Sequence, residues 1–155
     1  MAAITVLDIG ALETVSSLNG ADSLKIEGLA NGDSLSATVA GAGDINDDGS
    51  DNLIVGASGA DGLGHNNSGV VYVIFGNTAG FGATVDLSTL DGADGFEIKG
   101  LAATTFSGRT IAAIGDVNGD SVGHTSSAVL PALISCISSS VFHYFGAQTK
   151  EAFTV

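Results

Sequence analysis

Residues 43–57 read GDINDDGSDNLIVGA and join an acidic, oxygen-rich loop directly to a short apolar run. In this loop, side chains with oxygen ligands stand at alternate positions, at Asp44, Asn46 and Asp48, and Gly49 follows them. Alternating oxygen ligands followed by a glycine allow a short loop to wrap a hard cation such as Ca²⁺ with its side chains pointing inwards. The stretch therefore predicts a calcium-binding loop that connects two strands of a hairpin.

The predicted ligand set of this loop has five members. Asp44, Asn46 and Asp48 supply side-chain oxygens, Ser50 supplies a backbone carbonyl, and Asn52 closes the coordination shell. Magnesium is a poorer match, because it keeps several waters and rarely has an all-protein cage. A metal-free turn is the alternative interpretation. The density of carboxylates argues against it, because uncompensated like charges this close repel one another.

The loop is not an EF-hand, although it opens like one. An EF-hand needs a bidentate glutamate at the end of its loop, and Val55 occupies that position. Strand-like apolar runs, rather than helices, flank the loop. We therefore expect the ion to tie a β-hairpin.

An internal repeat organises the chain. The sequence LNGAD at 18–22 reappears as LDGAD at 90–94, and TVA at 38–40 reappears at the same offset as TIA at 110–112. This offset, from residue 18 to residue 90, also places GDIN at 43–46 on GDVN at 115–118 without a gap. Several matches at one spacing indicate a genuine repeat of one structural unit.

The acidic loop recurs in the second copy with fewer ligands. Asp116, Asn118 and Asp120 hold the alternate positions, but Ser121 replaces the turn glycine and His124 stands where the first copy has Asn52. We predict a weaker second metal site at Asp116, Asn118 and Asp120.

Short strands bounded by Gly, Asp, Asn and Ser are the predicted secondary structure. The expected strands cover residues 23–27, 37–42, 53–57, 70–75, 96–99 and 109–114. One repeat is interpreted as about four antiparallel strands, which cannot bury both faces alone, so the units must stack, and radial stacking gives a propeller. The predicted fold is all-β, with antiparallel four-stranded blades forming a partial β-propeller of about two blades.

Four segments follow from the repeat. Residues 1–17 are expected to be the remnant of a preceding repeat, 18–89 the first repeat, 90–120 the start of a second, and 121–155 a degenerate or atypical tail. The tail contains no Asp, and residues 125–129 read TSSAV where the repeat would give LIVGA. An echo of the pattern VYVIFG at 71–76 returns as VFHYFG at 141–146, at a slightly shorter offset.

Composition narrows the classes of function. The 155 residues include 17 acidic and 4 basic side chains, for a net charge of −13, and the basic residues are scattered singly. Nucleic acid is therefore a poor partner and a cation a good one. The single cysteine, Cys136, cannot form an intramolecular disulfide. The most apolar stretch, 128–142, is interrupted by Pro131 and several serines and is not expected to span a membrane.

These motifs resemble the FG-GAP repeat of integrin alpha-chain β-propellers and of many bacterial surface and secreted proteins. The resemblance extends over about residues 18–120. It rests on TVA at 38–40, GDINDDG at 43–49, LIVGA at 53–57 and GVVYVIFG at 69–76. It implies a Ca²⁺ site at Asp44, Asn46, Asp48, Ser50 and Asn52. The family usually has Asp where Asn52 stands, which implies weaker affinity here.

The resemblance also implies a function. It suggests a non-enzymatic, extracellular or cell-surface protein for adhesion or recognition, with a protein or carbohydrate ligand on a propeller face. The loop at 60–68 is the longest candidate for that contact. Family propellers close into rings, whereas this chain holds one complete repeat and parts of two others, so self-association through open blade edges is expected. The alternatives are an accessory segment of a secreted hydrolase and a truncated or frame-disturbed product without independent function. No familiar catalytic motif is present in the sequence.

Overall fold

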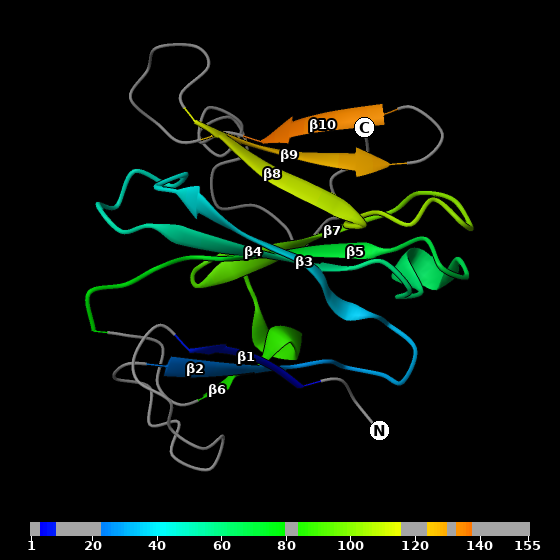
Figure 1. Ribbon diagram of the computed structural model, residues 1–155, viewed down its shortest axis with the longest axis horizontal. Helices are drawn as coiled ribbons and strands as arrows, with labels where there is room; N and C mark the ends of the chain where they lie inside the picture. Colours follow the sequence, from blue (N-terminus) through cyan, green and yellow to red (C-terminus); the bar gives the residue numbers. More distant parts are fainter. Residues whose placement is uncertain (1–3, 9–22, 80–83, 116–123, 130–132, 138–155) are drawn as a thin grey trace.

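The computed structural model describes residues 4–8, 23–79, 84–115, 124–129 and 133–137. In this part of the chain the protein is mostly β, and its strands form stacked sheets in three layers (Figure 1). Short 3₁₀ turns, η2 (Gly62–Gly64) and η3 (Leu87–Thr89), lie in the connections. The strands are β1 (Ile4–Asp8), β2 (Ser23–Glu27), β3 (Leu35–Gly43), β4 (Asn52–Ala57), β5 (Val70–Ile74), β6 (Thr84–Val85), β7 (Gly95–Lys99), β8 (Thr110–Gly115), β9 (His124–Val129) and β10 (Leu133–Ile137).

The central layer is a four-stranded antiparallel sheet in the order β3-β4-β5-β7. Every residue of β5 is buried, although successive side chains of a strand point to opposite faces. Both faces of this sheet are therefore covered. That explains why the sequence of β5 is a continuous apolar run rather than an alternating one.

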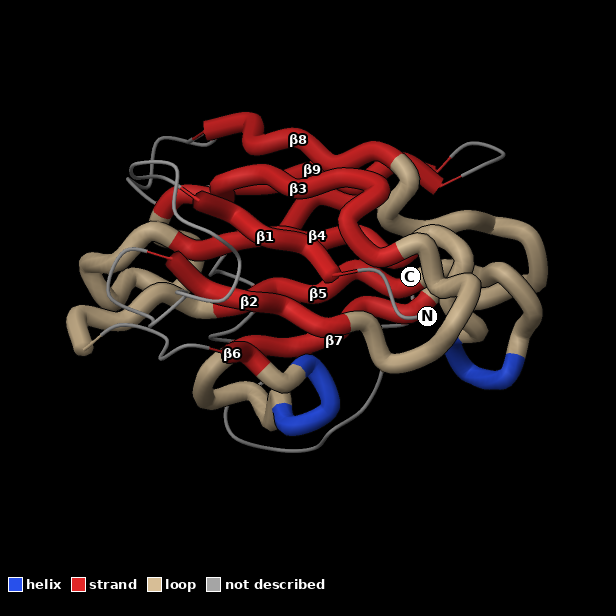
Figure 2. The backbone as a smooth tube through the Cα atoms, turned by 60° about the horizontal axis from the view of Figure 1, so that its bottom comes forward, coloured by secondary structure: helices blue, strands red, loops and turns tan. Residues whose placement is uncertain are grey.

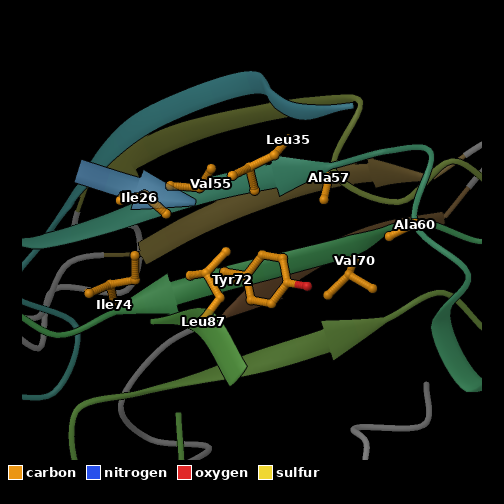
Figure 3. Packing of buried hydrophobic residues seen from close by; sticks show 9 residues of the cluster. All are labelled: Ile26, Leu35, Val55, Ala57, Ala60, Val70, Tyr72, Ile74 and Leu87. Carbon is orange, nitrogen blue, oxygen red and sulfur yellow. The ribbon is translucent and has the colours of Figure 1, made fainter. Parts of the chain in front are cut away.

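Two hydrophobic clusters, one on each face of the central sheet, hold the layers together. The cluster drawn in Figure 3 joins the central sheet to the layer that contains β2. Its buried members are Ile26, Leu35, Val55, Ala57, Ala60, Val70, Tyr72, Ile74 and Leu87. The cluster on the other face reaches β8 and contains Ala42, Ile45, Ile54, Val71, Val73, Phe75 and Ile111.

The outer layers are three-stranded sheets. In one, β1 pairs antiparallel with β2, and the short β6 joins the far edge of β2 in parallel. In the other, β9 lies between β8 and β10 and pairs antiparallel with both. Figure 2 shows the strands of the layers running side by side, with the connecting loops gathered at their ends.

The predicted strands are present, and their ends lie close to the expected positions. The prediction of a mostly β fold with an antiparallel four-stranded sheet is confirmed. The described strands form open sheets, and no sheet closes on itself among them.

The four-stranded sheet is not made from one repeat alone. Its fourth strand, β7, comes from the start of the second repeat. The first strand of the first repeat, β2, belongs to the neighbouring layer instead. Each repeat therefore contributes strands to two layers, so the polypeptide chain itself connects neighbouring sheets.

The pairing of the strands repeats more regularly along the chain than the amino-acid sequence does. Every pairing between β3 and β4 from Thr38–Gly56 to Gly43–Asn52 has a counterpart between β8 and β9, from Thr110–Ala128 to Gly115–His124. The register shift before Gly43 recurs before Gly115. Residues 124–129, where the apolar pattern is lost, therefore take the same place in their sheet that β4 takes in the central one.

The third strand of the last layer lies in the C-terminal tail and pairs with β9. This strand is β10, Leu133–Ile137, which is not among the strands predicted from the apolar pattern. The connection from β9 to β10 is much shorter in sequence than that from β4 to β5. The echo of VYVIFG at 141–146 lies outside the described residues.

Candidate metal centre in the β3–β4 loop

The acidic loop, residues 44–51, connects β3 to β4 at one end of the central sheet. Ile45 anchors it, because this side chain is fully buried in the cluster that reaches β8. Asp47 and Gly49 have left-handed backbones, with φ of 60° and 84°. These two residues turn the chain back on itself while Ile45 holds the loop to the core.

Asp44 organises the backbone of the turn. Its Oδ1 accepts a hydrogen bond from the Asp48 amide at 3.1 Å, and its Oδ2 accepts one from the Gly49 amide at 2.8 Å. Both carboxylate oxygens of Asp44 therefore lie inside the loop. This explains why an acid rather than an amide stands first, since a carboxylate only accepts hydrogen bonds.

A chain of side-chain hydrogen bonds connects the other predicted ligands. Asn46 Nδ2 donates to Asp48 Oδ2 at 2.7 Å, and Asn52 Nδ2 donates to Asn46 Oδ1 at 3.2 Å. The Ser50 amide donates to Asp48 Oδ1 at 2.8 Å. The hydrogen bond from Asn46, followed by that from the Ser50 amide, lowers the pKa of Asp48 below its ordinary value and favours its charged form.

Asn52 fastens the loop to the sheet. It is only 3% exposed, and its Oδ1 accepts a hydrogen bond from the Gly76 amide at 2.8 Å. Gly76 has no room for a side chain, because a Cβ there would stand 2.2 Å from the Asp51 carbonyl oxygen. Sequence reasoning missed Gly76 as a part of this site. The sequence feature that could have indicated it is the position of Gly76 directly after the apolar run of β5.

The donor chemistry of the loop suits a hard cation. It brings together two carboxylates, Asp44 and Asp48, the amide oxygens of Asn46 and Asn52, and the Ser50 carbonyl. Calcium prefers such a set of oxygen ligands. Among the described residues, no three or more His, Cys, Asp or Glu side chains group to hold a metal ion. Any ion in this loop would therefore depend on amide and backbone oxygens as well as carboxylates.

The five residues predicted as ligands lie within this one loop and the first residue of β4. The weaker set, Asp116, Asn118 and Asp120, lies outside the described residues. His124, in the position of Asn52, begins β9. The calcium site in the first loop and the weaker site in the second both stay predictions.

Comparisons with known proteins found no match, either to a protein-family model, to a curated protein or to a solved structure. Within the described residues, no helix has the length and apolar character needed to cross a membrane. What the structure defines is therefore a mostly β protein with a four-stranded antiparallel sheet and an oxygen-rich loop at one end of it.

Proposed function

We propose that the chain is a calcium-stabilised segment of an FG-GAP-like β-propeller. It is non-enzymatic and serves adhesion or ligand recognition outside the cell or at its surface. The observation that carries the proposal is made in the acidic loop. There, hydrogen bonds connect the side chains of Asp48, Asn46 and Asn52, so the oxygen atoms proposed to bind the ion are arranged before any ion arrives.

The proposed role of calcium is structural. Asp44, Asp47, Asp48 and Asp51 share one short loop, and no Lys or Arg lies between β3 and β4. Clustered carboxylates repel one another in the folded state, and a bound divalent cation reverses that repulsion. Ligation by Asp44, Asn46, Asp48 and the Ser50 carbonyl would tie the hairpin. The Asn52 Oδ1 accepts from Gly76 and retains a second lone pair for the ion.

The regular stacking of the layers supports the propeller part of the proposal. Equivalent pairings at the repeat offset, β3 with β4 and β8 with β9, indicate that consecutive sheets are copies of one unit. The exchange of the β7 strand between repeats connects each copy to the next. Stacked copies related by a constant step are the basis of both rings and solenoids, and twisted four-stranded units favour the ring.

An extracellular setting suits a site of this strength. The ligand set contains only two carboxylates, and weak sites of extracellular modules operate with a Kd on the order of 10⁻⁴ to 10⁻³ M. Calcium in the proposed setting would keep such a site filled.

Calorimetric titration with Ca²⁺, together with thermal melts in Ca²⁺ and in chelator, tests the proposal. The wild-type chain is compared with Asp44→Ala/Asp48→Ala and with the charge-matched control Asp86→Ala/Asp91→Ala, whose carboxylates lie outside the loop. Calcium at one hundred times its Kd should stabilise the wild type and the control by about 2.7 kcal/mol. The loop variant should gain nothing. Equal stabilisation of all three proteins, or none in the wild type, would exclude the calcium site.

A further inference from the structure

A second candidate site lies at the opposite end of the central sheet from the acidic loop. There a pocket of about 470 Å³ opens between the β2–β3 connection and the β4–β5 connection. The two connections are fastened together, since the Gly59 amide donates to the Asp33 carbonyl at 2.9 Å. A Cβ on Gly59 would stand 2.2 Å from the Gly32 carbonyl oxygen, so these walls are in close contact.

Tyr72 supplies a buried polar group at this pocket. The residue is 3% exposed and lines the pocket, and Figure 3 shows its hydroxyl oxygen directed along β5 toward Val70. No hydrogen bond to this hydroxyl is formed by any of the described residues. Buried hydroxyls usually have a partner, because leaving one without a partner costs free energy. A ligand group that hydrogen-bonds to Tyr72 would remove that cost.

The charged groups around the pocket are mainly acidic. Three carboxylates line it, those of Asp33, Asp61 and Glu97, against the single ammonium of Lys99. Lys99 forms an ion pair with Glu97, which cancels one of the negative charges. The uncompensated charge therefore comes from Asp33 and Asp61.

Each of these two carboxylates has one oxygen atom that could accept a hydrogen bond from a ligand. Asp33 Oδ2 accepts from the Ala30 amide at 3.0 Å, and Asp61 Oδ1 accepts from the Asn67 amide at 2.8 Å. These bonds fix the side chains. They leave Asp33 Oδ1 and Asp61 Oδ2 with no hydrogen-bond donor among the described residues.

We propose that this pocket binds an organic cation, a guanidinium or primary ammonium group, between Asp33 and Asp61 with the Tyr72 hydroxyl as a further hydrogen-bond partner. Charge-assisted hydrogen bonds from such a group to carboxylates are the strong kind. Leu29 and Leu63, which are 51% and 50% exposed and also line the pocket, would contact the apolar carbons that carry the charge.

Other ligands fit the pocket less well. A neutral sugar usually stacks on an exposed aromatic face, and the aromatic residue in this lining, Tyr72, is buried. A metal ion needs more converging ligands than two carboxylates with one free oxygen each. The inference names a ligand class for the proposed recognition function and rests on that function for its purpose. The site itself is independent of calcium.

Titration calorimetry with butylguanidinium tests the assignment, with the neutral isostere butylurea as the matched control ligand. We expect saturable binding of butylguanidinium and none of butylurea. Asp61→Asn, which keeps the oxygen that accepts from Asn67, should weaken binding about tenfold, and Tyr72→Phe about fivefold. Lys99→Met should strengthen binding about threefold, because it keeps the apolar stem and leaves Glu97 unpaired. Asp91→Asn, outside the pocket, should change nothing.

The opposite signs expected for Asp61→Asn and Lys99→Met separate a binding site from a structural role. Equal binding of butylurea, or unchanged affinity in Asp61→Asn, would overturn the proposal. Displacement of butylguanidinium by millimolar Ca²⁺ would also overturn it, since the site would then accept any cation. The Asp44→Ala/Asp48→Ala protein should still bind butylguanidinium, so failure of the calcium site and failure of this pocket are distinguishable.

Discussion

Gly56 of β4 lies directly against Gly108, and a Cβ atom on Gly56 would stand 2.0 Å from the Gly108 carbonyl oxygen. This contact joins the central sheet to the segment that leads into β8. The Thr38 hydroxyl strengthens the same junction by donating to the Arg109 carbonyl at 2.7 Å. Neighbouring layers are therefore joined by close backbone approach as well as by side-chain packing.

Gly56→Ala should separate these two backbones and destabilise the protein by about 1 to 3 kcal/mol, the range typical of overpacking a core. Urea denaturation monitored by circular dichroism measures the change. Gly41→Ala is the control, because a Cβ on Gly41 meets no atom within 4 Å. Its effect should stay within about 0.5 kcal/mol. Equal effects of the two substitutions would contradict the close contact.

Asn52→Ala should lower stability by about 1 to 3 kcal/mol even in chelator, because it leaves the Gly76 amide without its acceptor. Denaturation in the absence of calcium separates this structural effect from metal binding. Asn77→Ala is the matched control, since the Asn77 side chain accepts from the Ala79 amide at an exposed turn. A loss confined to calcium-containing buffer would show that Asn52 acts only through the ion.

The strands could be predicted because their signals are local. Apolar runs bounded by Gly, Asp and Asn specify where a strand begins and ends, whatever it pairs with. The acidic loop is local in the same sense, since its residues lie between two adjacent strands. Sheet membership is different. Nothing in the sequence of β2 or β7 indicates that each joins the sheet of a neighbouring repeat, because pairing depends on contacts distant in sequence.

Backbone conformation shows the repeat where side chains hide it. Ser34 and Phe106, which occupy equivalent positions of the two repeats, both have φ of 53°. Gly32 and Thr104 are equivalent in the same way and have φ of 97° and 61°. Side chains such as Phe and Thr rarely adopt the left-handed region, so residue type gives no hint of these turns. The pocket was equally hidden, because its walls come from two separate connections of the chain.

Asn46→Ala should raise the pKa of the Asp48 carboxyl, because the hydrogen bond from Asn46 is the main cause of its lowering. A carboxyl whose pKa is lower in the folded state stabilises the fold above its unfolded pKa of about 3.8, and loses that contribution as the pH falls toward the folded value. Carboxyl-detected NMR titration in chelator measures both proteins. Ser88→Ala is the control, since Ser88 lowers the pKa of Asp86 and not of Asp48. An unchanged Asp48 titration in Asn46→Ala would contradict the hydrogen bond.

Tyr72 should make the protein sensitive to alkali. Burial, with the negative charges of Glu97 and Asp33, raises the pKa of Tyr72 to about 12 from an ordinary value of 10.0. A group with a raised folded pKa contributes its full stability below the unfolded value, so this contribution is present below pH 10 and is lost as the pH rises toward 12. Absorbance titration of the phenolate band should show one late-titrating tyrosine that disappears in Tyr72→Phe. The same variant should flatten the loss of stability between pH 10 and 12 in urea denaturation. Tyr144→Phe, which removes the other tyrosine, should leave the late titration step in place. Loss of that step in Tyr144→Phe would show that the raised pKa does not belong to Tyr72.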